Sequence, residues 1–149
     1  MTIDDYLNQL RTLKHEVDAA GKRYDKLHEK VYSQRSSSNF DGSPRGKWHI
    51  NPKEDLIIEC SDAFKEYEEA HQRYKDFYNQ LYDNICSCLY LDGTLLATAY
   101  ISNAKNDADV LDGLGLILGN YNRNAVKSRL DEAKEHLREI LVQQGMDIE

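Results

Sequence analysis

The spacing of apolar residues in the first stretch of the chain limits its fold more than any other feature. These residues recur at alternating intervals of three and four over four heptads, at Ile3, Tyr6, Leu10, Leu13, Val17, Ala20, Tyr24, Leu27 and Val31. This spacing places them in one stripe along a helix, as in the seam of a coiled coil. Thr2 and Asp5 have the spacing of a capping box at its start. We therefore expect a long helix over residues 3–32.

A second stretch with the same spacing begins near Pro52, a residue that suits the first turn of a helix. Its seam positions are Ile57, Cys60, Phe64, Tyr67, His71, Tyr74, Tyr78, Leu81, Ile85 and Cys88. We interpret His71 as a core histidine. Two matching seams predict that residues 3–32 and 53–89 pair, either as an antiparallel hairpin within one chain or between the copies of a homodimer.

The stretch between these helices, residues 33–52, is predicted to be a flexible loop. It holds both prolines of the chain and five serines, which interrupt helix and strand alike. Trp48, the only tryptophan, stands between Lys47 and His49. An aromatic ring with basic neighbours suits stacking on a nucleobase or docking on a partner. The alternative is that Trp48 folds back and caps the end of the helix pair.

Composition excludes several classes of protein. Charged residues make up 30% of the 149 residues and apolar residues 40%, which predicts a folded chain. No apolar run approaches the roughly 18 residues needed to cross a bilayer, and residues 1–6 lack the pattern of a signal peptide. We therefore expect a cytoplasmic protein without a membrane partner.

No arrangement of residues in the sequence is typical of an enzyme. A phosphate-binding glycine loop, a nucleophile elbow and a paired-histidine metal helix are all missing from the sequence. Cys86 and Cys88 have no second pair at zinc-ligand spacing, so all three cysteines are interpreted as core thiols. The expectation is a protein with no catalytic residues, no cofactor and no metal.

A separate module is predicted over residues 92–149, after a hairpin of residues 1–91. A turn is expected at Asp92 and Gly93, and residues 94–101 form a compact apolar segment. A short helix is expected over residues 108–118, a glycine-containing break over 119–122 and an amphipathic helix over 123–144. Helix, turn and helix in this order are typical of a helix-turn-helix, so the predicted fold class is all-α.

The last of these helices carries a family resemblance. Residues 124–141 resemble the recognition helix in region four of bacterial sigma factors. The whole plan of long helix, serine-rich loop, second long helix and this ending resembles small phage proteins of the ArpU and RinA type, regarded as late-gene transcription regulators. The match residue by residue covers about 95–141, and its turn is one residue longer than usual, because Val126 stands seven residues after Gly119.

This resemblance implies double-stranded DNA as a partner. It places Asn122, Arg123, Asn124 and Lys127 near bases or phosphates and makes Arg129 a phosphate contact. The heptad helices would then form a homodimer or contact RNA polymerase. The formal net charge of −7, with a basic excess only over residues 35–52, argues against strong nonspecific DNA binding.

The competing hypothesis is a phage-encoded inhibitor or adaptor that binds another protein. Its surface would be the acidic, Tyr-rich second helix together with the loop, and its candidate residues are Trp48, Glu66, Glu69, Tyr74 and Tyr78. In that case residues 123–144 are an ordinary solvated helix packed on the rest of the chain.

Overall fold

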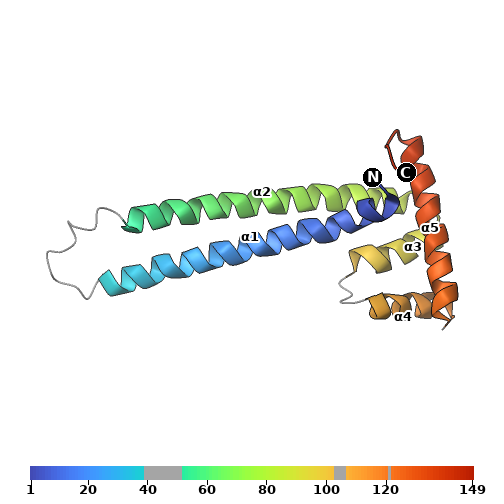
Figure 1. The fold of residues 1–149 in the computed structure, drawn as a ribbon, viewed down its shortest axis with the longest axis horizontal. Coiled ribbons are helices and arrows are strands. Elements are labelled where there is room, and N and C mark those ends of the chain that lie inside the picture. Colours follow the sequence, from blue (N-terminus) through green and yellow to red (C-terminus); the bar gives the residue numbers. More distant parts are fainter. Residues whose placement is uncertain (39–51, 103–106, 121) are drawn as a thin grey trace. The chain divides into compact units, whose positions relative to one another are not determined.

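The computed structural model describes residues 1–38, 52–102, 107–120 and 122–149, and within these ranges the chain is all-α, which confirms the predicted fold class. Two long helices are followed by a cluster of shorter ones (Figure 1). In order, the elements are α1 (Ile3–Ser38), α2 (Pro52–Cys86), α3 (Tyr90–Leu96), the π-helix η2 (Ala97–Ile101), α4 (Asp107–Leu118) and α5 (Arg123–Gln143). None of the helices described is both long and apolar enough to cross a membrane.

The start of α1 is fixed by the predicted capping box. The backbone N–H of Asp5 donates to the Thr2 hydroxyl at 3.1 Å, and the N–H of Thr2 donates to the Asp5 carboxylate at 3.2 Å. These bonds satisfy two N–H groups that the first turn of a helix leaves without partners. The hydrogen bonds from Thr2 also lower the pKa of Asp5, so this cap is in place at neutral pH.

The chain divides into two compact units, and the division differs from the boundary predicted at residues 91 and 92. One unit is Leu13–Tyr74, which we call the helix-pair unit. The other combines Met1–Thr12 with Lys75–Glu149, and we call it the C-terminal unit. The first turns of α1 and the last turns of α2 thus belong with the short helices.

Within the helix-pair unit, α1 and α2 run antiparallel. Arg23 pairs with Glu66 at 2.7 Å, and Glu16 pairs with Arg73 at 3.7 Å, so lower numbers on one helix meet higher numbers on the other. Exposed ion pairs contribute only about 0–1 kcal/mol each. The stability of this unit therefore depends chiefly on the apolar stripe between its helices.

The predicted seam is confirmed for α1, where each of the nine seam residues is buried or half-buried. For α2 it was wrong at Ile57 and Phe64, which are exposed, while its other seam residues are buried or half-buried. Ile57 and Phe64 are 44% and 41% exposed, whereas their neighbours Leu56 and Ala63 are half-buried and 1% exposed. Ala70 is likewise more deeply buried than His71.

The reason for this shift is the small size of the alanines on α2. A short side chain lets two helices approach closely, so the buried line of α2 follows Ala63 and Ala70. Gly21 of α1 shows the same closeness, because a Cβ at this position would lie 3.3 Å from the ring of Tyr67. On α2 the alanines Ala63 and Ala70, and not their larger neighbours, therefore mark the line of closest approach.

The C-terminal unit has a well-buried core. Tyr6 packs edge-on against Phe77, with ring centroids 5.4 Å apart, and its hydroxyl accepts a hydrogen bond from Asn84 at 2.8 Å. Burial raises the pKa of Tyr6. Further side chains that are at most 8% exposed come from every helix of the unit: Leu7, Leu10, Leu81, Ile85, Leu95, Leu96, Ala99, Val110, Leu114, Val126, Leu130, Ala133, Leu137 and Leu141.

The turn expected at Asp92 and Gly93 is not there. Both residues lie inside α3, and the interruption of the helix comes earlier, at residues 87–89. Gly93 is needed for packing, because a Cβ there would lie 3.0 Å from the carbonyl oxygen of Ile85. Gly93 therefore indicates that two helices approach each other closely here, and not that the chain turns.

The segment after α3 continues as the π-helix η2. Thr94 and Thr98 each donate their hydroxyl to the carbonyl four residues earlier, at 2.8 Å, and Ser102 repeats this pattern. Such bonds to the helix backbone often accompany a local bend. Within η2, Ala99 is buried and Tyr100 is half-buried.

The predicted loop over residues 33–52 is only partly described. α1 continues to Ser38, so six residues assigned to the loop are helical, and α2 begins at Pro52 as expected. Serine disfavours a helix only mildly, which allows α1 to extend beyond its last seam residue. Residues 39–51, with Trp48, lie outside the described residues.

The corrected seam of α2 leads to a stability prediction. Replacing the buried Ala70 with Leu should overpack the contact with α1 and lower the free energy of unfolding by about 1–3 kcal/mol. The same change at the exposed Ala19 of α1 should alter it by less than about 0.5 kcal/mol. Urea unfolding followed by circular dichroism measures both, and equal effects at the two positions would contradict the assignment.

Candidate functional site

The predicted pair of C-terminal helices is present, with α4 and α5 joined by a short turn. Gly119 ends α4 with a φ of +67°, and the N–H of Asn120 donates to the Gly115 carbonyl at 3.0 Å. A left-handed glycine followed by this bond is a Schellman motif. Asn122 then caps α5, because its side-chain oxygen accepts from the N–H of Asn124 at 3.1 Å. Both ends of the turn are thus fixed by hydrogen bonds.

Packing between the two helices also fixes the turn. A Cβ at position 115 would lie 2.7 Å from the Asn120 carbonyl oxygen, so only glycine fits there without movement. The side chain of Val126 lies 3.9 Å from the same point and is 1% exposed. Val126 therefore joins the first turns of α5 to α4, in spite of the longer turn.

The opposite side of the first turns of α5 faces solvent. Asn122, Arg123, Asn124 and Lys127 are all exposed, as their predicted role in binding DNA requires. Arg123 lies 3.4 Å from Asp112 of α4, but both side chains are about 60% exposed, so this pair is weak. The oxygen of Asn122 is occupied by its cap, which leaves its amide nitrogen to donate to a ligand.

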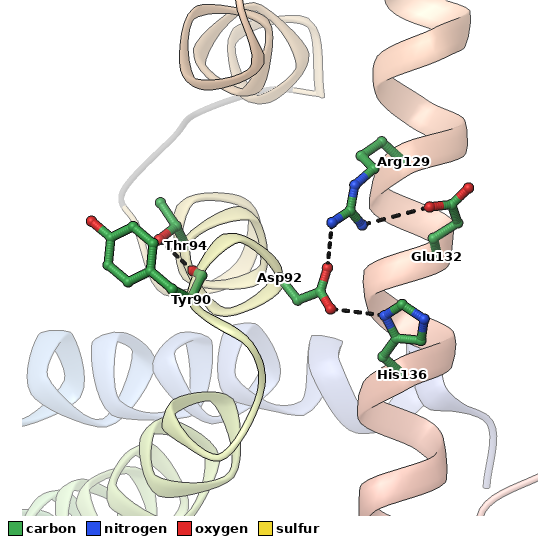
Figure 2. Close-up of polar contacts among 6 residues, drawn as sticks. All are labelled: Tyr90, Asp92, Thr94, Arg129, Glu132 and His136. Atoms are coloured by element: carbon green, nitrogen blue, oxygen red, sulfur yellow. Dashed lines mark hydrogen bonds and ion pairs between the residues drawn. The ribbon is translucent and has the colours of Figure 1, made fainter.

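Arg129, the predicted phosphate contact, has a different position. Figure 2 shows it turned toward Asp92 of α3, with its guanidinium 2.7 Å from Oδ1 of that carboxylate. His136 reaches Oδ2 through Nδ1 at 2.8 Å. Asp92 is 1% exposed and the Arg129 side chain 27%, so the guanidinium takes part in a contact inside the unit, and its role as a phosphate contact stays a prediction.

The charges of this cluster are balanced inside the unit. Burial acts to raise the pKa of Asp92, but the hydrogen bond with His136 and the nearby Arg129 outweigh burial and hold the pKa below its ordinary value. The Arg129 guanidinium lowers the pKa of Asp92 both through its contact with Oδ1 and through its charge. Glu132 lies 3.7 Å from Arg129, too far for a hydrogen bond.

The sequence held one signal for this cluster. Arg129 and His136 are seven residues apart, which places them on the same side of α5, two turns from each other. Nothing in the sequence tells which acid they meet, because Asp92 comes from a segment that was interpreted as a turn.

The residues predicted to bind a protein partner lie along α2. Glu66 is already paired with Arg23, and Glu69 is exposed. Tyr74 is half-buried in the helix-pair unit, and Tyr78 is half-buried in the C-terminal unit, where it stacks on Tyr82 with ring centroids 6.3 Å apart. The fifth residue of this set, in the loop, is not described.

Comparisons of the chain with protein-family models, curated proteins and solved structures give no match. In the described part of the chain, no group of three or more His, Cys, Asp or Glu side chains is arranged to hold a metal ion. The assignment of a function therefore depends on the residues themselves.

The buried carboxylate yields a prediction about pH. Asp92→Asn should lower the free energy of unfolding at pH 7 by about 1–3 kcal/mol, because Arg129 and His136 lose a charged partner. The folded pKa of Asp92 lies below the ordinary value of 3.8, so its contribution is present above that value and is lost as the pH falls through the folded pKa.

The difference between wild type and Asp92→Asn, measured by urea unfolding, should thus shrink as the pH is lowered toward 3. The exposed Asp83→Asn is the matched control and should change stability little at either pH. A difference that stays constant or grows in acid would contradict the charged state of Asp92.

Proposed function

We propose that this chain is a DNA-binding transcription regulator of the phage type, acting in the cytoplasm and reading double-stranded DNA with the start of α5. The observation that carries the proposal is a set of four exposed residues at the start of α5: Asn122, Arg123, Asn124 and Lys127. The opposite side of these turns packs against α4, which fixes the position of the helix. In the major groove, arginine can donate to the two acceptors of guanine, and asparagine can both donate to and accept from the adenine edge. A recognition helix commonly contacts bases with its N-terminal residues.

The charges of α5 are consistent with contact through its first turns only. Beyond Lys127 the helix carries Asp131, Glu132, Glu135 and Glu139, all exposed. These acids would be repelled by phosphates, so DNA would lie against the first two turns. The first two turns of α5 carry two exposed cations, Arg123 and Lys127, so the salt dependence of binding should be shallow, since its slope scales with the number of neutralised phosphates. Affinity would then depend on a specific sequence, or on a second copy of the chain.

A second candidate function is binding to another protein, such as RNA polymerase or a host protein that the chain inhibits. The observation that favours it is the junction of α2 and α3, where large apolar side chains face solvent. Leu89 is 76% exposed, Tyr90 90% and Tyr82 49%. Apolar groups exposed together are typical of an interaction surface. Glu66, Glu69, Tyr74 and Tyr78 along α2 remain candidates for the same function.

The decisive experiment is a mobility-shift series with random and phage-promoter DNA at increasing salt. Arg123→Ala combined with Lys127→Ala should weaken binding and flatten the salt slope by about one unit for each lost phosphate contact. Both residues are exposed, so the helix content and the unfolding midpoint should stay near those of wild type.

The matched control is Lys26→Ala combined with Lys30→Ala, two exposed cations with the same spacing on α1. It removes equal charge and should leave DNA binding unchanged. If wild type binds neither kind of DNA at low salt, the protein-binding function is adopted instead. An equal loss with both double variants would show that only overall charge matters.

A further inference from the structure

A cavity of about 400 Å³ lies in the C-terminal unit. Its volume falls within the range of small-ligand sites, about 300–1,000 Å³. The walls come from four elements, and the lining residues are Asp4, Asn8 and Arg11 of α1, Ala99 and Tyr100 of η2, Val110 and Leu111 of α4, and Lys127, Leu130, Asp131 and Lys134 of α5. One part of this wall is apolar and another is charged.

The acids of the cavity are already paired. Lys134 lies 2.9 Å from Asp4 and 3.7 Å from Asp131, and its Nζ is 5.7 Å from the centre of the Tyr100 ring. Burial acts to lower the pKa of Lys134, but Tyr100 and Asp4 outweigh burial and raise it well above its ordinary value. Lys134 therefore stays charged and holds both carboxylates, which leaves little attraction for a cationic ligand.

Two other cations of the cavity are free to bind. Arg11 and Lys127 have no ion-pair partner in the part of the chain that the structure describes, and both are exposed. With Lys134 they give three positive charges against the two of Asp4 and Asp131, a net charge of +1. The chain as a whole carries −7. The cavity is thus a basic site in an acidic protein.

We propose that this cavity binds a small organic anion, with a carboxylate or phosphate group held by Arg11 and Lys127. The apolar or aromatic part of the ligand would lie against Val110, Leu111 and Leu130. Charged donors bind such anions more strongly than neutral ones do. The apolar wall adds burial that an inorganic ion cannot use.

This site bears on the proposed function through Lys127, which belongs both to the cavity and to the DNA-reading residues. If the proposed function holds, an anion bound at Lys127 competes with DNA for it, so ligand and DNA weaken each other's binding. Such coupling is reciprocal. The chain would then respond to a small metabolite.

The test uses the full chain without DNA, so its failure is distinct from a failure of the proposed function. Phenyl phosphate, benzoate, inorganic phosphate and benzylamine are titrated while the methyl signals of Val110, Leu111 and Leu130 are followed by NMR. Phenyl phosphate or benzoate should bind saturably and shift these signals, and the stronger of the two identifies the anionic group. Benzylamine and inorganic phosphate should bind at least about tenfold more weakly.

Arg11→Gln and Lys127→Gln should each weaken binding of the better probe by about tenfold or more, because each removes a charged hydrogen bond. Asn8→Trp should block the cavity, since Asn8 is an exposed lining residue. Lys75→Gln, an exposed cation of the same unit outside the cavity, should leave binding unchanged.

Three results would overturn the proposal: equal binding of benzylamine, an equal loss with Lys75→Gln, or no saturable binding of either organic anion.

Discussion

The buried carboxylate of Asp92 is the interaction on which the arrangement of the C-terminal unit depends. A buried carboxylate that is 1% exposed requires nearby polar partners, and both of them, the guanidinium of Arg129 and Nδ1 of His136, come from α5 (Figure 2). They fix the rotation of α5 about its own axis relative to α3. With that rotation set, Val126 and Leu137 face the core, and the polar residues at the start of α5 face solvent. The candidate DNA surface therefore depends on a contact that is not part of it.

Much of the fold could be predicted because the side chains on one face of a helix recur at a fixed interval in the sequence. The seam of α1 and the bounds of α4 and α5 follow from apolar spacing and from turn residues. The seam of α2 was misplaced in part, since the larger Phe64 and His71 were chosen over their neighbours Ala63 and Ala70, which are nearly fully buried. Gly93 was misinterpreted for a related reason, because a missing side chain can serve close packing as well as a turn. Small residues are ambiguous until their neighbours in space are known.

The candidate DNA-binding site could be predicted only for residues that are close together in the sequence. Asn122, Arg123, Asn124 and Lys127 occupy consecutive turns of one helix, so their shared exposure could be inferred from the periodicity of α5. The role of Arg129 could not, because its partner lies 37 residues earlier, on another helix. The cavity could not be predicted for the same reason, since its walls include parts of α1 and α5 that lie more than 100 residues apart in the sequence.

The inclusion of Met1–Thr12 in the C-terminal unit also determines the order in which the protein can fold. Tyr6 and Leu7 are among its most deeply buried residues, yet Asn84, the hydrogen-bond partner of Tyr6, comes 78 residues later. During synthesis these first turns leave the ribosome long before the helices that cover them exist. The core of the C-terminal unit cannot form until α5 has been synthesised. Until then the apolar side chains of residues 1–12 stay exposed to solvent. Contacts of such long sequence separation slow folding and favour aggregation or capture by a chaperone in the meantime.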